Sequence, residues 1–340
     1  MIKIAISGLG KVGIEFIKIL KEKRKESKEK YGIKYKVVAA VGSQWGIVKD
    51  EGIELDLLLT GKYGSELIKS TGLAKEEYRG IYGIMRTKAD VLIEASPTVI
   101  EDGGAALDHL KEAIKKKMDI ITLAKGPLVL AFDELMEGCR LNKKSFKFSG
   151  TTAAALPTID IGEGSLAGCE IKSIVGILNG TTNYILSKMM DEERSFETCL
   201  QEAIEAGIAE KNHHLDTSGF DTACKILILA KALMGSKKQL GDIIIKGIED
   251  VTLQNVFNAK ESNGTIKLIG RAYRLDGDIQ IEVAPVELSS EHLLAQVNYK
   301  NKGILFDTDL MGEIAAIGGK SDPRGAAAAA FKDLINIYRK

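Results

Sequence analysis

The stretch that decides the fold opens the chain, where residues 2–13 read Ile-Lys-Ile-Ala-Ile-Ser-Gly-Leu-Gly-Lys-Val-Gly. Its first half, Ile2–Ser7, is a short apolar run with β-branched residues and is typical of a buried strand. Its second half matches Gly-x-Gly-x-x-Gly and leads into apolar residues at helical spacing over residues 12–21. In that context the glycines permit a tight turn, a close approach of a pyrophosphate and close packing of helix on strand. The stretch therefore predicts a dinucleotide-binding turn.

Strands and helices alternate beyond this turn. Residues 36–41, 90–95 and 119–123 read as strands, and residues 104–117 and 129–141 read as helices. Such alternation is typical of a parallel sheet in an α/β protein. The almost wholly charged residues 21–30 are expected to form a solvated helix end and loop. We therefore predict a Rossmann-type domain over residues 1–145, to which residues 319–340 return.

The second half of the chain has a different pattern. We expect a strand over residues 170–178, three helices within 182–234, two strands over 266–275 and 278–288, and a last helix over 324–338. The helix at 219–234 is apolar nearly all round and should be buried. Residues 146–318 are thus predicted to form a second, α+β domain.

Composition narrows the class of protein. The 340 residues include 47 Lys+Arg and 47 Asp+Glu, so the net charge is zero and neither a nucleic-acid nor a membrane partner is indicated. A small-molecule substrate is expected. The four cysteines are scattered without a C-x-x-C pair, which favours reduced thiols in the cytoplasm.

The end of the second strand bears on the choice of cofactor. Backbone contacts to the dinucleotide are expected along the whole turn: Gly8, Leu9, Gly10, Lys11, Val12 and Gly13. The ribose end usually meets a carboxylate, but here Gly42-Ser43 follows the strand and no carboxylate comes before Asp50. Because a carboxylate would repel a 2′-phosphate, its absence favours NADP(H), with Ser43 as a hydroxyl contact. NAD(H) remains the alternative.

A charged cluster precedes and enters the buried helix of the second domain. Its members are Glu210, Asp216, Asp221 and Lys225. Carboxylates bind an ammonium group through charge-assisted hydrogen bonds, and a lysine can move a proton at an oxygen on a carbonyl carbon. The alternative is structural, because Ser218-x-x-Asp221 resembles a capping box and an i, i+4 Asp–Lys pair commonly decorates a solvated face. Lys125, at the carboxyl end of a predicted strand, is either a second site lysine or a surface loop residue.

Three motifs resemble the homoserine dehydrogenase family: Gly-Ile-Leu-Asn-Gly-Thr-Thr-Asn-Tyr-Ile-Leu at 176–186, Ala-Lys-Gly-Pro-Leu at 124–128, and the spacing of charges over 210–225. The likeness covers essentially the whole chain and is to a short form without a kinase or regulatory domain. It implies NAD(P)-dependent interconversion of L-homoserine and L-aspartate 4-semialdehyde, a step of threonine and methionine biosynthesis. The alternatives are another amino-acid dehydrogenase or a dinucleotide-sensing protein without chemistry.

The resemblance also implies a role for individual residues. Lys225 would be the proton donor and acceptor, with Asp221 and Glu210 on the substrate and Asp216 supporting them. Thr181 would also contact substrate, and Lys125 would lie near both substrate and nicotinamide. Four further residues would contact the cofactor: Ser96, Thr98, Gly207 and Gly319. The family implies a homodimer, built from residues near 150–165 and 280–318.

Two parts of the family pattern are altered: the glycine-rich loop before the last helix, residues 317–325, and a loop that binds a monovalent cation. A glutamate is expected at the start of a monovalent-cation loop, but the run at 148–157 reads Phe-Ser-Gly-Thr-Thr-Ala-Ala-Ala-Leu-Pro, with Ser149 in that place. Backbone carbonyls of Thr152, Ala154 and Leu156 are the remaining candidates for binding sodium.

Overall fold

The computed structural model describes residues 1–339 and divides into two compact units. The first comprises Met1–Ala155 with Asp322–Lys340, and the second comprises Leu156–Ser321. The first break therefore follows Ala155 instead of residue 145, and the return begins at Asp322 instead of 319. The reason is packing: β6 (Phe146–Lys147) joins the first sheet, and α7 (Gly150–Ala153) packs on α14 (Pro323–Tyr338).

The first unit contains a six-stranded sheet in the order β3-β2-β1-β4-β5-β6. Its strands are β1 (Ile2–Ser7), β2 (Tyr35–Val41), β3 (Gly46–Val48), β4 (Val91–Glu94), β5 (Asp119–Thr122) and β6. All neighbours are parallel except β3, which pairs antiparallel with β2. The predicted Rossmann-type sheet is confirmed. Its strand order reverses between β1 and β4, and ligands of such sheets bind in the crevice at that point.

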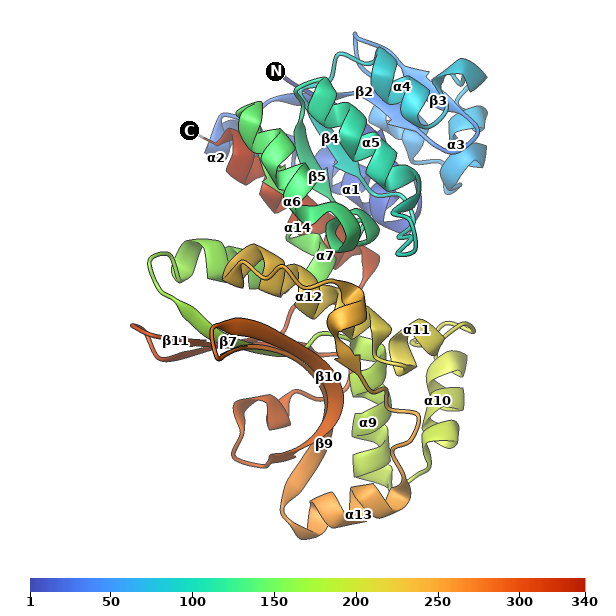
Figure 1. The fold of residues 1–340 in the computed structure, drawn as a ribbon. Coiled ribbons are helices and arrows are strands. Elements are labelled where there is room, and N and C mark those ends of the chain that lie inside the picture. The colour runs from blue at the N-terminus through green and yellow to red at the C-terminus, as the bar shows by residue number, and fades with distance from the viewer. Residues whose placement is uncertain (340) are drawn as a thin grey trace. The chain divides into compact units, whose positions relative to one another are not determined.

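Helices cover this sheet (Figure 1). They include α1 (Lys11–Glu22), α3 (Gly64–Ser70), α4 (Ile81–Arg86), α5 (Gly104–Lys115), α6 (Gly126–Leu141) and α14. Helix α14 packs on α1, so the last residues of the chain complete the core formed by the first. The expectation of a loop within residues 21–30 was wrong, because α2 (Arg24–Tyr31) is helical there. Pairs such as Lys23–Glu26 support this exposed helix, and Gly32 ends it with a left-handed φ of +69°.

The second unit contains another six-stranded sheet, in the order β12-β11-β7-β9-β10-β8. Its strands are β7 (Ile171–Ile177), β8 (Ile244–Ile245), β9 (Gly264–Leu275), β10 (Asp278–Ser289), β11 (Gly303–Thr308) and β12 (Glu313–Ile317). The sheet is antiparallel apart from the β8–β10 pair. The predicted α+β class is confirmed, although β8, β11 and β12 were not predicted.

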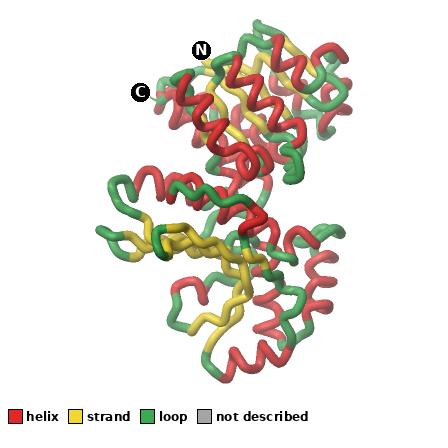
Figure 2. Tube along the Cα trace, in the orientation of Figure 1, coloured by secondary structure: helices red, strands yellow, loops and turns green. Residues whose placement is uncertain are grey.

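The helices of the second unit are α8 (Thr158–Asp160), α9 (Gly180–Glu192), α10 (Phe196–Glu205), α11 (His214–Thr217), α12 (Phe220–Met234) and α13 (Leu253–Glu261). Figure 2 shows them in red beside the yellow strands. Helix α12 packs on β7, β9 and β10, and it is buried as predicted, with nearly every residue from Thr222 to Lys231 out of solvent. Within residues 1–339, none of the helices combines the length and apolar character needed to span a membrane.

Candidate active site in two parts

The glycine-rich turn between β1 and α1 has a different constraint at each glycine. Gly8 has a φ of +84°, and a β-carbon there would lie 2.4 Å from the backbone of Ala95. A β-carbon on Gly13 would lie 2.1 Å from the carbonyl oxygen of Gly8. Gly10, in contrast, has an ordinary φ of −78° and open space within 4 Å of an added β-carbon. The fold itself therefore requires Gly8 and Gly13, whereas no protein atom requires a glycine at position 10.

The segments after β4 and β5 lie together at the carboxyl edge of the first sheet. Lys125 caps the start of α6, and its backbone N–H donates to Oγ1 of Thr98 at 3.3 Å. A β-carbon on Gly126 would lie 1.8 Å from the carbonyl oxygen of Val99, so these two segments are in close contact. Ser96 and Thr98 are thus brought near Lys125 on one edge, as ligand-binding residues of such sheets are.

Ser43 lies in the exposed turn that follows β2. Its hydroxyl is 3.4 Å from the hydroxyl of Ser65, which also accepts the backbone N–H of Gln44 at 3.1 Å. The hydroxyl groups of Ser43 and Ser65 therefore form a small neutral polar surface at the end of the second strand. Ser65 was not predicted, since a serine beginning a short helix normally indicates only a cap.

The charged cluster of the second unit is assembled at the start of α12. Nζ of Lys225 donates to Oδ2 of Asp221 at 2.5 Å and to the carbonyl oxygen of Leu178 at 2.9 Å. Both side chains of this ion pair are only 11% exposed. Gly219 is the N-cap of α12 and no side chain caps it, so the capping-box alternative for Ser218 and Asp221 is wrong. A pair so poorly exposed is also no ordinary solvated surface pair.

Asn179 connects the members of this cluster and was missed as a functional residue. Its Nδ2 donates to Oδ1 of Asp216 at 2.6 Å and to Oδ2 of Asp221 at 2.8 Å. Its Oδ1 accepts the backbone N–H of Thr182 at 2.9 Å, which caps α9. An asparagine before a helix reads as a cap, and it is one; only the fold reveals that the same amide also fixes two carboxylates.

The other predicted substrate and cofactor residues of this unit lie outside the hydrogen-bonded cluster around Asn179. Oγ1 of Thr181 donates to the carbonyl oxygen of Ile208 at 3.3 Å. This bond attaches α9, which begins in the 176–186 motif and is called the signature helix below, to the loop before the cluster. Glu210 and Gly207 lie in that loop and are exposed, with Gly207 at a φ of +66°. Gly319, at a φ of +77°, lies in the second unit and not in the returning segment.

The altered cation run is held by contacts within the first unit. Oγ of Ser149 donates to Oδ1 of the buried Asp333 at 2.9 Å, and its N–H donates to Oδ2 at 3.2 Å. The serine hydroxyl is thus already bound, and the run itself contributes no carboxylate. Among residues 1–339, no group of three or more His, Cys, Asp or Glu side chains is arranged to hold a metal ion. We derive no chemistry from a cation here.

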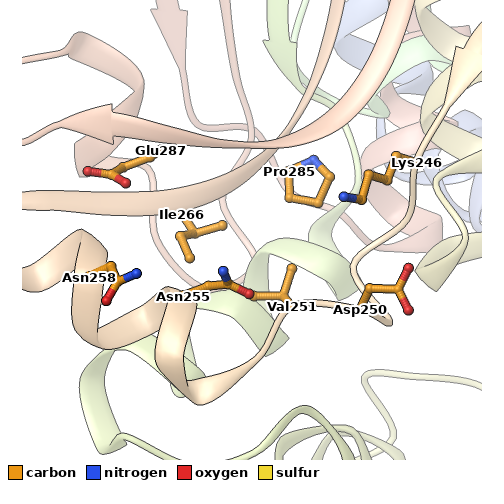
Figure 3. A pocket seen from close by; sticks show the side chains of 8 residues that line it. All are labelled: Lys246, Asp250, Val251, Asn255, Asn258, Ile266, Pro285 and Glu287. Atoms are coloured by element: carbon orange, nitrogen blue, oxygen red, sulfur yellow. The ribbon is translucent and has the colours of Figure 1, made fainter.

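A separate pocket of about 230 Å³ lies between α13 and the β9–β10 strands (Figure 3). Its lining mixes charged, amide and apolar side chains: Lys246, Asp250, Val251, Asn255, Asn258, Ile266, Pro285 and Glu287. None of them belongs to the charged cluster of Glu210, Asp216, Asp221 and Lys225.

A second buried lysine, Lys267 on β9, was also not anticipated. Its side chain is fully buried, and Nζ donates to the carbonyl oxygen of Val297 at 2.8 Å and to Oδ1 of Asn298 at 2.7 Å. Nδ2 of Asn183, from the signature helix, donates to the same carbonyl oxygen at 3.0 Å. Lys267 therefore anchors the segment against which the signature helix packs. Burial lowers the pKa of Lys267 to about 8.

This shift predicts a pH dependence of stability. Below about pH 8 the side chain of Lys267 is protonated in both the folded and the unfolded chain. The unfolding free energy is then lowered by the full cost of burying its ammonium group. As the pH rises towards 10.5, the folded chain loses the proton first, so the unfolding free energy should rise relative to that of a Lys267→Met variant. The relative gain is on the order of 3 kcal/mol. Urea unfolding of both proteins at pH 7.5, 9 and 10 measures it; a difference that does not change with pH would contradict the assignment.

Each unit, described by itself, carries one feature typical of an enzyme site. The first has a glycine-rich turn at the point where the order of a parallel sheet reverses, and the second has a nearly buried lysine beside two carboxylates. These features define an oxidoreductase that uses a nicotinamide cofactor and acts on a CH–OH group.

Comparison with known proteins gives the family. A sequence model described as homoserine dehydrogenase matches residues 157–335. The homoserine dehydrogenase of Methanocaldococcus jannaschii is 38% identical, over 98% of both chains. An NAD(+)-dependent homoserine dehydrogenase of Pseudomonas canavaninivorans is 29% identical over 99% of this chain and 96% of its own.

The fold agrees with this assignment. A crystal structure from Archaeoglobus fulgidus matches with a TM-score of 0.90 at 33% identity, over 100% of both chains. The homoserine dehydrogenase of Thiobacillus denitrificans matches with a TM-score of 0.84 at 26% identity, over 99% of this chain and 73% of its own. The chain belongs to the homoserine dehydrogenase family, whose enzymes interconvert L-homoserine and L-aspartate 4-semialdehyde.

Proposed function

We propose that Lys225 is the proton donor and acceptor at the homoserine hydroxyl, and that the Gly8–Gly13 turn binds the cofactor. One observation carries this proposal: Lys225, whose side chain is 11% exposed, keeps its ammonium group beside Asp221 on a buried and largely apolar helix. A buried ion pair rarely adds stability over an apolar pair, so a use in chemistry accounts for it better.

In this proposal each side chain has one task. The cofactor, when bound, supplies or accepts the hydride at the carbon atom. Asp221 and Glu210 bind the substrate ammonium, and Asn179 keeps the carboxylates of Asp216 and Asp221 together. As negative charge develops on the aldehyde oxygen, the Lys225 ammonium stabilises it and then gives up a proton. Lys125 adds positive charge at the carboxyl edge of the first sheet.

The same proposal extends to the cofactor. We expect NADP(H) to be preferred, because the end of β2 carries neutral hydroxyls at Ser43 and Ser65 and no carboxylate that would repel a 2′-phosphate. The NAD(+)-dependent relative marks the opposite choice within the family.

Ser43→Asp tests this preference. The new carboxylate would repel a 2′-phosphate and could accept a hydrogen bond from a 2′-hydroxyl, so the ratio of kcat/KM for NADPH over NADH should fall about tenfold or more. Semialdehyde reduction is followed by nicotinamide absorbance with both cofactors in parallel, and Ser43→Asn serves as a neutral control of similar size. An unchanged ratio in Ser43→Asp would place the 2′-group elsewhere.

We also propose that the enzyme acts as a cytoplasmic homodimer. Four free cysteines suit a reducing compartment. Large apolar side chains are exposed within residues 280–318, a region expected at the contact: Val286, Leu293, Tyr299, Leu310, Met311 and Ile317. Covering such a surface with a second copy would remove it from water. Sodium at the carbonyls of Thr152, Ala154 and Leu156 has no support beyond the family likeness.

A further inference from the structure

A buried acid–imidazole pair lies directly beneath the carboxyl edge of the first sheet. Glu94 is the last residue of β4 and is fully buried, and His109 on α5 is 4% exposed. Nδ1 of His109 lies 2.8 Å from Oε2 of Glu94. The other carboxylate oxygen, Oε1, accepts the backbone N–H of Ser96 at 2.8 Å. The carboxylate is therefore held on one side by the imidazole and itself holds the first residue of the loop after β4.

Hydrogen-bond contacts also link this pair to the neighbouring strand, β1. Oγ of Ser7 lies 2.9 Å from Nδ1 of His109 and 3.1 Å from Oγ of Ser96. Ser7 is the last residue of β1, immediately before Gly8, and it is the register partner of Glu94. Four side chains thus join the ends of β1 and β4, the two strands at which the order of the sheet reverses.

The direction of these hydrogen bonds follows from the chemistry of the groups. An ionised carboxylate only accepts, so Nδ1 of His109 must carry the hydrogen that binds Glu94. Ser7 cannot then donate to Nδ1, and its hydroxyl pairs with that of Ser96 instead. The N–H group of the imidazole therefore holds one oxygen of Glu94, and the other oxygen of Glu94 holds Ser96 in the loop after β4. Without that donor, Glu94 would be a buried carboxylate that keeps only one of the two hydrogen bonds described here, the one from Ser96.

We infer that His109 is a positioning residue for the dinucleotide. Through Glu94 it holds the N–H of Ser96, and with it the Ser7–Ser96 hydroxyl pair, beside the Gly8 turn, and its hydrogen bond stabilises the buried carboxylate in this position. The inference rests on the proposed binding of the cofactor at Gly8–Gly13. It assigns a function to a helix residue that does not itself lie in the turn.

The test compares two amides at position 109. His109→Asn puts an amide N–H near the place of Nδ1, whereas His109→Gln puts it near the place of Nε2. NADPH fluorescence titration of the full-length enzyme should give a Kd raised about tenfold or more in His109→Gln and within about threefold of the parent in His109→Asn. The KM for aspartate semialdehyde, and kcat at saturating NADPH, should stay within about threefold in both, because neither variant changes Lys125 and the groups proposed for substrate binding and proton transfer, Asp221, Glu210 and Lys225, belong to the other unit.

Other outcomes would overturn the inference. They are a parent-like Kd in His109→Gln, or equal losses of affinity and thermal stability in both variants, which would mark a purely structural histidine. If neither variant folds, Ser7→Ala decides, since it removes one hydroxyl and leaves the Glu94–His109 pair. The Kd of Ser7→Ala for NADPH should rise severalfold, and an unchanged Kd contradicts the inference.

Gly10→Ala in the same titration separates the proposed role of His109 from the proposed cofactor site. If it leaves the Kd unchanged, the cofactor site itself is misassigned; if it weakens binding while His109→Gln does not, only the role of His109 fails.

Discussion

Replacing Lys225 with methionine is expected to lower kcat for semialdehyde reduction by about two to four orders of magnitude, the range typical for removing a general acid or base. Methionine keeps most of the volume of the side chain on the buried helix α12 but removes the ammonium beside Asp221. Asn179 still donates to Asp221, so the remaining carboxylate keeps one of its hydrogen bonds. The Kd for NADPH should change little, because the turn that is proposed to bind it belongs to the other unit.

Lys231 offers a matched control on the same helix. As a whole residue Lys231 is 7% exposed, against 8% for Lys225. Because it lies six residues further along the helix, its side chain points to a different side. Lys231→Met should therefore retain kcat within a few fold, while any loss of thermal stability should resemble that of Lys225→Met. Steady-state rates and thermal unfolding of both variants measure this. Near-normal turnover in Lys225→Met would refute the assigned role.

Gly10→Ala is expected to weaken NADPH binding by about ten- to a hundredfold, roughly 1.4–2.8 kcal/mol, with almost no change in thermal stability. The backbone of Gly10 has a φ that alanine adopts readily, and an added β-carbon meets no protein atom within 4 Å. The loss of affinity then comes only from the β-carbon occupying space that a pyrophosphate would need. Isothermal titration with NADPH, together with thermal unfolding, separates affinity from stability.

Two other glycines serve as controls. Gly13→Ala would put a β-carbon 2.1 Å from a backbone oxygen of the turn, so it should lower the melting temperature as well as the affinity. Gly241→Ala also adds its β-carbon to open space, but in the second unit, and it should change neither property. Parent-like affinity in Gly10→Ala would show that the dinucleotide does not approach this backbone.

Much of the fold followed from local patterns. The β1 bounds, Ile2–Ser7, and the buried α12 were predictable because apolar runs and helical periodicity report directly on burial. The short β12 was missed because its five residues, Glu-Ile-Ala-Ala-Ile, do not alternate between polar and apolar types although the strand is exposed or half-buried throughout. Helix α2 was missed because it has almost no apolar face, and its support comes from ion pairs along an exposed surface.

The site was predictable to a lesser extent, and for a physical reason. Charges spaced along one helix, such as Asp221 and Lys225, share a face whatever the tertiary structure, so their pairing could be expected. Contacts between distant segments could not: Asn179 reaches two aspartates, and Lys267 reaches Val297 and Asn298, only after the second unit folds. The same is true of Glu94 and His109, which read as an ordinary strand end and helix surface until the fold buries them.

The most direct test of the account is a crystal structure of the unreactive complex with NADPH and L-homoserine. Lys225 is predicted to have its Nζ about 3 Å from the hydroxyl oxygen of homoserine, a hydrogen-bonding distance, with the dinucleotide phosphates over Gly10. A homoserine hydroxyl bound by other groups, while Lys225 still contacts only Asp221 and Leu178, would contradict the central claim.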